Sequence, residues 1–360
     1  MLCIKSISVF QYKNYAQGTW DLDAKLIGIA GRNGTGKTNL LEAIYFCCFT
    51  KGYFSGSDAQ LVQKGAQGMR LAAQFDKSGD PYEVTALIRE SGKKEFRVNG
   101  ALCERMADHI GQLPAVVVAP DDVEIIIAGS EERRRFMDAL FSQIDHEYLL
   151  QLMTYNRLLQ QRNSLLKQQA ETGRRQPDLM DVLDQQLAAP ANFVHQKRKD
   201  YLAQLIKGVV NRYQAISGES YQPELRYESG LDKAPFPTLL QQSRERDWLA
   251  QRTTMGIHRD DLGIYLDDGL FKQLASQGQR KSLLFALKMA AFDLLKVNKG
   301  FAPILLLDDV FEKLDEGRMQ NLLQEVCVEN DGQVLLTDTH PARINKSLER
   351  LSVNYRMISL

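Results

Sequence analysis

The sequence has few cysteines and no pattern that would use them. The five thiols are odd in number, and no two of them have the Cys-Xaa-Xaa-Cys spacing of a metal or redox site (Cys3, Cys47, Cys48, Cys103 and Cys327). This number and spacing imply neither a disulfide framework nor a zinc site. We therefore predict that the cysteines are buried free thiols.

Long hydrophobic runs are also missing. Apolar stretches such as residues 40–49 are interrupted by a charge, here Glu42, and are shorter than the roughly 20 residues that cross a bilayer. Residues 1–5 have the pattern of a strand rather than of a secretion signal. We expect a cytoplasmic protein without a membrane partner.

The chain lacks an excess of charge of either sign, since 45 Lys and Arg residues balance 45 Asp and Glu residues. A protein that coats DNA by general electrostatic attraction needs a broad basic surface. If this protein binds nucleic acid, a local patch must do so. Its 360 residues exceed the roughly 250–300 over which a single core grows, so we expect more than one lobe.

The strongest positive signal is a phosphate-binding loop between an apolar run and a helical pattern. Residues 26–30 predict a buried strand, and the apolar residues spaced along 40–45 predict a helix. In such a loop, backbone N–H groups and the helix N-terminus face the phosphate oxygens of a nucleoside triphosphate. We expect Lys37 to contact the β- and γ-phosphates and Thr38 to bind Mg²⁺. The loop consists of Gly31, Arg32, Asn33, Gly34, Thr35, Gly36, Lys37 and Thr38.

A second apolar run ends in two carboxylates. Residues 304–307 are aliphatic, as in a strand buried on both faces, and Asp308 and Asp309 follow directly. Carboxylates at the carboxyl end of such a strand face the ligand crevice. We expect Asp308 to hold Mg²⁺ together with Thr38, and Asp309 to orient or deprotonate the attacking water. The alternative is a strand that is simply capped by two acids at a turn.

A candidate signature helix begins near residue 276. Its first residues are Ser276, Gln277, Gly278 and Gln279, and an apolar stripe follows at 283, 287, 290 and 294. A helix start with a serine hydroxyl and free N–H groups is an anion site suited to a γ-phosphate, although alone it is more often an ordinary cap. If this helix and the P-loop lie at opposite edges of the head, two heads must pair head to tail with ATP between them.

The chain contains two regions with different patterns. Early segments are short alternating strands with polar turns, including a hairpin signal at Asn99-Gly100. Residues from about 133 to 213 are long helices broken by a polar turn at 171–178, which we interpret as an arm. We divide the chain into an N-terminal half of the head with the P-loop (1–132), an inserted helical arm or second lobe (133–252) and a C-terminal half (253–360).

The arm carries many basic residues, which form either a solvated helix face or contacts to nucleic acid. They are Arg157, Arg162, Lys167, Arg174, Arg175, Lys197, Arg198 and Lys199, besides the triplet Arg133-Arg134-Arg135. Three successive side chains of a helix cannot point the same way. We expect one or two of the triplet to pair internally with residues such as Asp138.

Taken in order, these motifs resemble the ABC-type ATPase heads of the SMC kind, and among them the RecF family of bacterial recombinational repair. The resemblance extends over nearly the whole chain. Two positions depart from the family pattern: Ile257 stands where proline is usual, and the segment 53–56 lacks the usual arginine. The further segments that carry it are 10–15, 39–44, 58–66, 120–122, 129–138, 161–167, 256–262 and 308–315.

The resemblance implies an α/β fold: an ABC-type P-loop ATPase head, with a mixed sheet and an antiparallel subdomain, plus a helical arm or second lobe. It also implies that the loop 312–315 crosses a dimer seam and that the segment after residues 334–336 senses the γ-phosphate. Thr337, Thr339 and His340 all remain candidates for that contact. We include His340, with Lys37 and Asp309, among the catalytic candidates.

In function, the resemblance implies a weak DNA-dependent ATPase of recombinational repair and replication restart. ATP would drive a homodimer that clamps gapped DNA at junctions of single and double strands, and hydrolysis would release it. It further implies cooperation with RecR and RecO in loading RecA. Hydrolysis should be slow, because Asp309 is one methylene shorter than the glutamate common in ABC heads.

Other functions remain as alternatives: another SMC-like ABC ATPase, or a scaffold that binds ATP without useful hydrolysis. A transporter motor is disfavoured because the interval between P-loop and signature holds a helical arm where a standard glutamine loop would be expected. A nuclease is disfavoured because no second carboxylate cluster with metal-ligand spacing occurs in the sequence.

Overall fold

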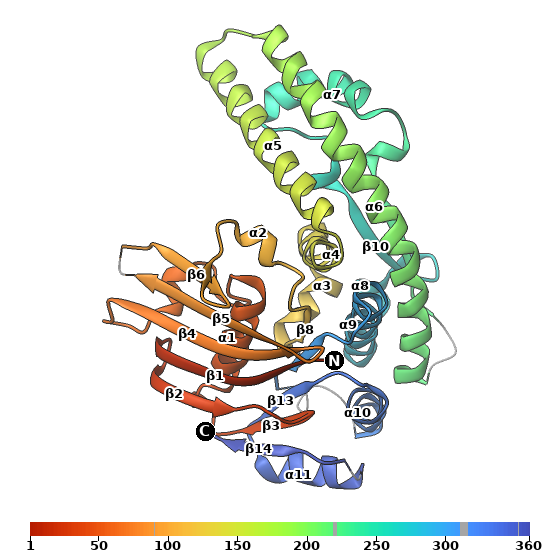
Figure 1. The fold of residues 1–360 in the computed structure, drawn as a ribbon. Coiled ribbons are helices and arrows are strands. Elements are labelled where there is room, and N and C mark those ends of the chain that lie inside the picture. Colours follow the sequence, from red (N-terminus) through yellow and green to blue (C-terminus); the bar gives the residue numbers. More distant parts are fainter. Residues whose placement is uncertain (90, 219–221, 310–315, 352) are drawn as a thin grey trace. The chain divides into compact units, whose positions relative to one another are not determined.

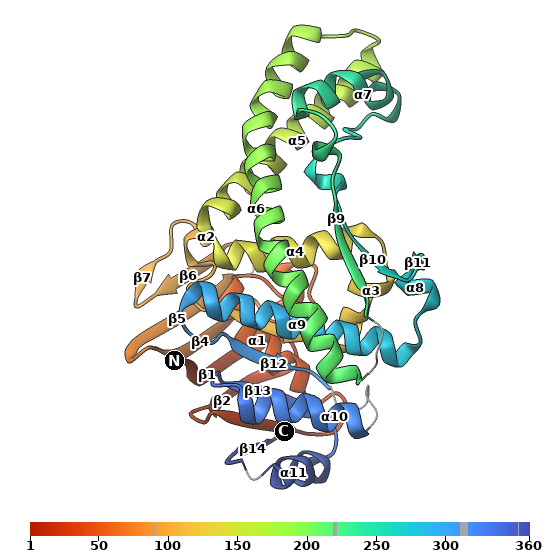
Figure 2. The same ribbon diagram turned by 90° about the vertical axis from the view of Figure 1, so that its right-hand side faces the viewer.

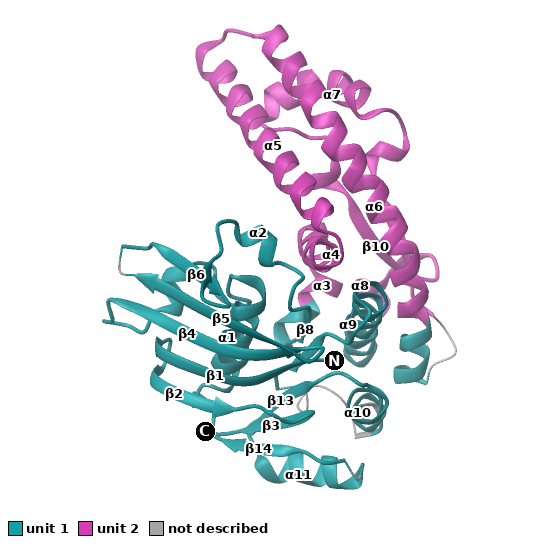
Figure 3. Ribbon diagram, viewed as in Figure 1, with its two compact units in different colours: residues 1–123, 211–220, 276–360 teal, residues 124–210, 221–275 magenta. Residues whose placement is uncertain are grey.

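The computed structural model describes the whole chain except residues 90, 219–221, 310–315 and 352 (Figure 1). The chain forms two compact units (Figure 3). Unit 1 contains residues 1–123, 211–220 and 276–360, and unit 2 contains residues 124–210 and 221–275. The three-part division predicted from the sequence stays a prediction, and the compact units have boundaries of their own.

A five-stranded parallel sheet forms the centre of unit 1, in the order β14-β3-β13-β12-β8. Strands β3, β8, β12 and β13 are buried along their whole length, which confirms the prediction made for residues 26–30 and 304–307. Because all five strands run the same way, their carboxyl ends meet at one edge. The strands are β3 (Leu26–Ala30), β8 (Ala115–Val118), β12 (Ile304–Leu307), β13 (Val334–Asp338) and β14 (Arg356–Ser359).

Unit 1 also contains a six-stranded antiparallel sheet with the strand order β2-β1-β4-β5-β6-β7. The Asn99-Gly100 hairpin is confirmed, with φ of 49° at Asn99 and 80° at Gly100. Parallel and antiparallel strands thus occur together in unit 1, as the family resemblance implies, and they form separate sheets. The strands are β1 (Leu2–Tyr12), β2 (Tyr15–Asp21), β4 (Gly68–Lys77), β5 (Asp80–Arg89), β6 (Lys94–Val98) and β7 (Ala101–Leu102).

Helix α1 (Lys37–Phe49) lies between the two sheets. It contacts β4 and β5 on one side and β8 and β13 on the other, which is why almost all of its residues are buried. The helix and the inner faces of both sheets form the main apolar core of unit 1. The helix that the sequence predicted after the phosphate-binding loop is therefore confirmed, and it is anchored on two sides.

Two further helices of unit 1 also pack on the parallel sheet. Helix α9 packs on β8, and α11 packs on β3 and β13. Helices α9 and α10 lie on the face of the parallel sheet opposite to α1 (Figures 1 and 2). The helical elements are α9 (Gln277–Lys299), α10 (Glu316–Leu323), α11 (Pro341–Arg350), the π-helical turn Gln324–Glu329, α2 (Met106–His109), η1 (Asp58–Leu61) and η2 (Pro120–Val123).

Unit 2 is mainly helical, and the polar turn expected at 171–178 joins its long helices α5 and α6. Its small sheet, in the order β11-β10-β9, was not predicted. Within the described residues, no helix is both long and apolar enough to span a membrane. The elements are α3 (Glu124–Ile127), α4 (Ser130–Ile144), α5 (His146–Thr172), α6 (Pro177–Ser217, whose last turns belong to unit 1), β9 (Glu224–Glu228), η3 (Gly230–Asp232), α7 (Phe236–Ala250), η4 (Ile257–Arg259), β10 (Asp261–Leu266), β11 (Gly269–Leu270) and α8 (Phe271–Leu274).

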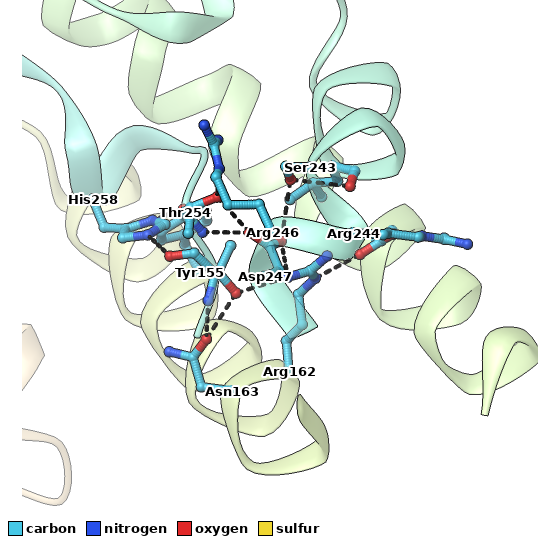
Figure 4. A network of polar contacts seen from close by, with 12 residues as sticks. Tyr155, Arg162, Asn163, Ser243, Arg244, Arg246, Asp247, Thr254 and His258 are labelled. Carbon is cyan, nitrogen blue, oxygen red and sulfur yellow. Dashed lines mark hydrogen bonds and ion pairs between the residues drawn. The ribbon is translucent and has the colours of Figure 1, made fainter. Parts of the chain in front are cut away.

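A buried charge network holds the helices of unit 2 together (Figure 4). The Arg162 side chain on α5 is fully buried. Its Nε donates to Asp184 of α6 at 2.7 Å, and its Nη1 donates to Asp247 of α7 at 2.7 Å and to the Thr253 hydroxyl at 2.9 Å. One guanidinium therefore joins three helices and the segment after α7.

The cysteines are free, and four of the five are buried. Burial raises the pKa of the Cys47 thiol to about 12, so this thiol stays protonated. Cys103 is only half-buried, and the expectation that every cysteine is buried is wrong for this residue. Its position, just after the short edge strand β7, explains the exposure.

Candidate nucleotide-binding site

The phosphate-binding loop follows β3 at the carboxyl edge of the parallel sheet and leads into α1. Gly34 and Gly36 have positive φ, 85° and 113°, which side chains rarely adopt. A Cβ on Gly36 would also lie 2.5 Å from the Tyr15 hydroxyl. Glycine is therefore required at this position for its backbone angle and for the space it leaves.

Lys37 begins α1 and folds back over the loop. Its side chain is buried, and Nζ donates to the carbonyl oxygens of Gly31 at 2.9 Å and of Arg32 at 3.4 Å. Arg32 and Asn33 are exposed at the loop tip, and the Thr35 hydroxyl donates to the Arg32 carbonyl at 3.0 Å. The loop is thus closed on itself with one ammonium group held against it.

The ends of α1, β12 and β13 meet at one carboxylate. The Thr38 hydroxyl donates to Asp308, 2.9 Å from Oδ2, and the Thr337 hydroxyl donates to Oδ1 at 2.8 Å. Burial raises the pKa of Asp308, and the hydrogen bonds from the two threonines oppose this. A buried carboxylate with an adjacent hydroxyl is a donor set that a hard cation such as Mg²⁺ prefers, so these residues fit the ion predicted from the sequence.

Asp309 lies next to this carboxylate in a strained backbone conformation. Its φ is 43°, in the left-handed region that is uncommon for residues other than glycine, and its N–H donates to the Thr337 hydroxyl at 2.9 Å. Such strain is retained where the surroundings determine the conformation, often at functional sites. The bond to Thr337 fixes the direction in which the chain leaves β12.

The three candidates for the γ-phosphate sensor have different environments. Thr337 is fully buried, and its hydroxyl already binds Asp308 and the Asp309 N–H. Thr339 and His340 instead line an open cavity of about 600 Å³ together with loop residues 30–33 and residues 359–360. Asp338 shapes this turn, because its Oδ1 accepts from the His340 N–H at 2.6 Å.

The candidate signature helix begins as predicted. Ser276 is the N-cap of α9: its hydroxyl accepts from the Gln279 N–H at 3.2 Å, while the Gln279 side chain accepts from the Ser276 N–H at 2.7 Å. Ser276 and Gln277 are exposed, and Gly278 is partly exposed.

Asn14, which was not predicted as a site residue, supports the loop. Its Nδ2 donates to the Thr35 carbonyl at 3.0 Å, and its Oδ1 accepts from Asn39 at 2.8 Å. Asn14 lies in the turn between β1 and β2, far from the motif in the chain. The only signal was the motif-like segment 10–15, which indicated a family pattern but no contact.

Glu42, in the middle of α1, was also missed as a structural group. This fully buried carboxylate accepts from the N–H groups of Phe54 and Ser55 at 2.9 Å each, and from the Lys13 ammonium. It therefore shapes the segment 53–56, where the family's usual arginine is absent. In the sequence Glu42 interrupts an apolar run. In the structure its carboxylate has two backbone N–H donors and one cation as partners.

The same segment is linked to α9. The Tyr53 hydroxyl donates to Asp122, and Lys288 of α9 contacts both groups, at 3.1 Å from the Tyr53 oxygen and 3.0 Å from Asp122 Oδ2. Lys288 and Asp122 are buried. Through Glu42 and Tyr53, the helix that begins at the phosphate-binding loop is thus connected to the helix that begins at Ser276.

Comparison with known proteins gives one consistent family. Residues 3–357 match the family model described as the RecF/RecN/SMC N terminal domain. Among curated relatives, the DNA replication and repair protein RecF of Flavobacterium johnsoniae is 37% identical over 357 residues, covering 99% of each chain. That of Bacteroides fragilis is 38% identical and covers 99% of this chain and 96% of its own.

Solved structures confirm the fold. The structure of "the recombination mediator protein RecF-ATPrS in RecFOR pathway" is 27% identical, with a TM-score of 0.87, covering 95% of this chain and 93% of the other. An Smc head domain from Pyrococcus furiosus, 15% identical with a TM-score of 0.55 over 96% and 91% of the two chains, shows the fold alone. The predicted fold class, an ABC-type α/β ATPase head with a helical lobe, is confirmed.

Proposed function

The chain belongs to the RecF/RecN/SMC N-terminal domain family, and we propose that it is an ATP-switched DNA-binding protein of recombinational repair and replication restart. One observation carries the proposal: Lys37, Thr38, Asp308 and the 339–340 turn gather at the edge of the parallel sheet where the phosphate-binding loop lies. Its relatives are named for DNA replication and repair, and the ATP-analogue complex above belongs to such a relative.

Within this site each side chain has a distinct task. The loop 31–36 and the amino end of α1 bind the triphosphate through N–H groups, and Lys37 neutralises its β- and γ-oxygens. Thr38 and Asp308 would hold Mg²⁺, which supplies positive charge to the phosphate oxygens when bound. Asp309 orients the attacking water, and His340, exposed on the cavity wall, contacts the γ-phosphate.

Hydrolysis on this site is slow, and binding is the useful output. The short Asp309 side chain reaches its water only through the backbone direction that the left-handed φ imposes. General-base assistance depends on hydrogen-bond reach to the water, so a short carboxylate gives up part of that assistance. A slow step leaves the ATP-bound state long-lived enough to act as a switch.

ATP joins two copies of the chain head to tail. The start of α9 has exposed Ser276 and Gln277, and α9 lies on the sheet face opposite to α1. These features support a second copy, rather than the same chain, as the source of the group that caps the γ-phosphate. The loop 312–315, which the family resemblance places at the dimer seam, lies outside the described residues.

The joined pair clamps gapped DNA at junctions of single and double strands, in the cytoplasm, and acts with RecR and RecO to support RecA loading. The name of a relative's structure, which places it in the RecFOR pathway, supports these partners. The zero net charge supports a clamp with a local contact surface rather than a broadly basic coat.

Sedimentation with ATP, with ADP and without nucleotide, each with and without gapped DNA, tests the shared site. We expect ATP-dependent dimers that retain DNA. Ser276→Arg should bind ATP normally yet remain monomeric, because the new side chain obstructs only the face presented to the partner. A Ser276→Arg variant that dimerises as the wild type does would overturn the shared site.

Phosphate release separates the switch from an ATP-binding scaffold. Asp309→Asn should keep ATP-dependent dimers and lower single-turnover hydrolysis by roughly 10² or more, as expected for loss of a general base. Lys37→Arg should instead weaken the response to nucleotide at every step. Equal phosphate release by Asp309→Asn and wild type would favour the scaffold, and wild-type turnover of tens per second, about the rate of a kinase, would contradict slow hydrolysis.

A further inference from the structure

The segment 256–261 of unit 2, Gly-Ile-His-Arg-Asp-Asp, was singled out in the sequence but has no place in the nucleotide site. Its backbone is tightly constrained. Gly256 has a φ of 133°, and a Cβ there would lie 2.4 Å from the Tyr155 hydroxyl. Ile257 is completely buried. No side chain other than hydrogen fits at the first position, so the segment has little freedom to move.

Three polar side chains of the segment, those of His258, Asp260 and Asp261, form hydrogen bonds with other residues of unit 2. Asp260 accepts from Arg198 Nη1 at 2.9 Å and from the Tyr227 hydroxyl. Asp261 accepts from Arg133, with 2.7 Å to Nε and 2.8 Å to Nη2. The Arg198 guanidinium also donates to the Ile257 carbonyl at 2.8 Å. Two arginines from two different helices, α4 and α6, thus hold one short segment.

The histidine of the segment is held from both ring nitrogens. The Tyr155 hydroxyl lies 2.6 Å from Nδ1, and Nε2 lies 3.0 Å from the Thr253 carbonyl, which requires an Nε2–H donor (Figure 4). Burial lowers the pKa of His258 to about 4. The imidazole is therefore neutral near pH 7 and contributes no charge to the surface.

Arg259 is the exception in this segment. It is exposed, and its side chain makes no hydrogen bond or ion pair with the described residues. Its backbone is nonetheless fixed, because its N–H donates to the Gly256 carbonyl at 2.8 Å. Every neighbouring side chain is bound inward, so the rigid segment presents one guanidinium to solvent.

A second guanidinium lies beside it. Arg134 Nη1 donates to the carbonyl of Asp260, the residue that follows Arg259, at 2.8 Å. Both arginines also lie near enough to His258 that their positive charges add to the lowering of its pKa, after the effect of burial. Two cations from distant parts of the chain, one exposed (Arg259) and one half-buried (Arg134), are therefore neighbours.

The charge of Arg134 is less compensated than that of its neighbours on α4. Arg133 is paired with Asp261, and Arg135 is paired with Glu131 at 2.6 Å and Glu132 at 2.8 Å. Among the described residues, the Arg134 side chain donates to a neutral carbonyl. Burial, followed by repulsion from Arg198, lowers its pKa, and Asp261, Glu131 and Asp138 oppose this. Of the triplet, the middle arginine is the one placed to attract an external anion.

We propose that Arg134 and Arg259 form a binding site for the phosphodiester backbone of duplex DNA. The inference rests on the proposed function and names residues that carry it out. Guanidinium groups bind phosphate through planar paired donors, and such backbone contacts position the protein without reading sequence. Because the segment is held rigidly before binding, little conformational freedom is lost when the phosphate arrives.

Salt-dependent DNA binding tests the pair. Affinity for a gapped duplex, measured with ATP across a salt series, should fall about tenfold for Arg134→Gln or Arg259→Gln, and the salt slope should fall by roughly one for each. Glutamine at 134 can still donate to the Asp260 carbonyl, so the fold is kept. Arg259→Lys should retain most of the salt slope, because it keeps the charge.

Arg135→Gln is the matched control, since it removes the same charge from the same helix but breaks only exposed pairs with Glu131 and Glu132. We expect its salt slope to equal that of the wild type. If all three glutamine variants lose the same affinity and slope, the effect is one of net charge and the proposal is overturned. Unchanged slopes for Arg134→Gln and Arg259→Gln also overturn it. A wild type that retains no DNA with ATP refutes the proposed function itself.

Discussion

The interiors of the two units are stabilised by different kinds of interaction. The centre of unit 1 is an apolar cluster in which α1 lies between two sheets. In unit 2, two of the largest fully buried side chains are arginines, Arg162 and Arg198, and each is bound by two carboxylates. Unit 1 also has buried charges, such as Glu42 and the Lys288–Asp122 pair, but its main core is apolar, whereas in unit 2 the arginine–carboxylate pairs lie at the centre.

The two kinds of interior differ in the free energy and in the directionality of their interactions. Apolar burial contributes about 25 cal/mol per Å² without preferred direction, so it supports a sheet whose edge can carry a site. A buried ion pair gains little net free energy after desolvation, but its bonds have direction. In unit 2 these bonds fix the 253–261 region residue by residue, and we attribute the use of buried charge there to the need for that fixed geometry.

The largest expected effect comes from breaking the charge network of unit 2. Arg162→Met keeps the length of the side chain but leaves Asp247 buried without its cation and Asp184 with Arg244 as its remaining cation. Loss of one partner of a buried pair typically costs about 3–5 kcal/mol, and we expect that decrease in the free energy of unfolding of unit 2. Urea unfolding followed by fluorescence measures it.

The chain's two tryptophans allow the units to be followed separately. Trp248 is in α7 of unit 2, and Trp20 is in β2 of unit 1. In a Trp20→Phe background the Trp248 signal should shift to lower urea in Arg162→Met, while in a Trp248→Phe background the Trp20 signal should stay. A decrease in the free energy of unfolding below 1 kcal/mol, or equal shifts of both signals, would contradict this difference between the units.

Lowering the pH should reduce the stability of both units. His109 in unit 1 and His258 in unit 2 each have a tyrosine hydroxyl at Nδ1 and a backbone carbonyl at Nε2, and burial lowers each pKa from 6.5 to about 4. At a pH between about 4 and 6.5, each of these histidines binds a proton in the unfolded chain but not in the folded chain. Stability therefore falls as the pH is lowered, by about 2 kcal/mol per histidine from pH 7 to pH 5.

Single histidine variants assign this loss to the units. His258→Gln should flatten the pH dependence of the Trp248 signal between pH 7 and pH 5, and leave that of the Trp20 signal as it was. His109→Gln should do the reverse. If both signals keep their full pH dependence in either variant, the two imidazoles are not the groups that titrate.

The smallest effect is expected at the helix cap of unit 1. Ser276→Ala removes the hydroxyl that accepts the Gln279 N–H, and loss of such a cap costs about 1 kcal/mol. The Trp20 transition should move by that amount, and the Trp248 transition should not move. A loss of 3 kcal/mol or more would mean that the cap supports packing far beyond the first turn of α9.

Much of unit 1 could be predicted from the sequence. The strands at 26–30 and 304–307, the helix after the phosphate-binding loop and the helix start at Ser276 all appear where local patterns placed them. These patterns are local, because buried parallel strands and helix caps depend on neighbouring residues. The adjacency of Thr38 and Asp308 was also predictable, since carboxyl ends of parallel strands meet at one edge.

The interior of unit 2 could not be predicted in the same way. The basic pattern of the arm predicts solvated or nucleic-acid-binding side chains at Arg162 and Arg198, whereas both are buried among carboxylates from other elements. Arg133 pairs with Asp261 and not with Asp138. A charged residue on a helix has no local signal that shows whether its partner is solvent or an acid far along the chain, so only the tertiary fold decides.

The strand order of the parallel sheet has a consequence for synthesis on the ribosome. Strand β3 has as its neighbours β13 and β14, and β8 pairs with β12, so neither early strand pairs with the other. Roughly 180 residues must be translated between β8 and β12, which takes about 10–40 s at typical elongation rates. Throughout that interval two aliphatic strands are without partners, which makes the nascent chain a client for chaperones and gives unit 2 time to fold first.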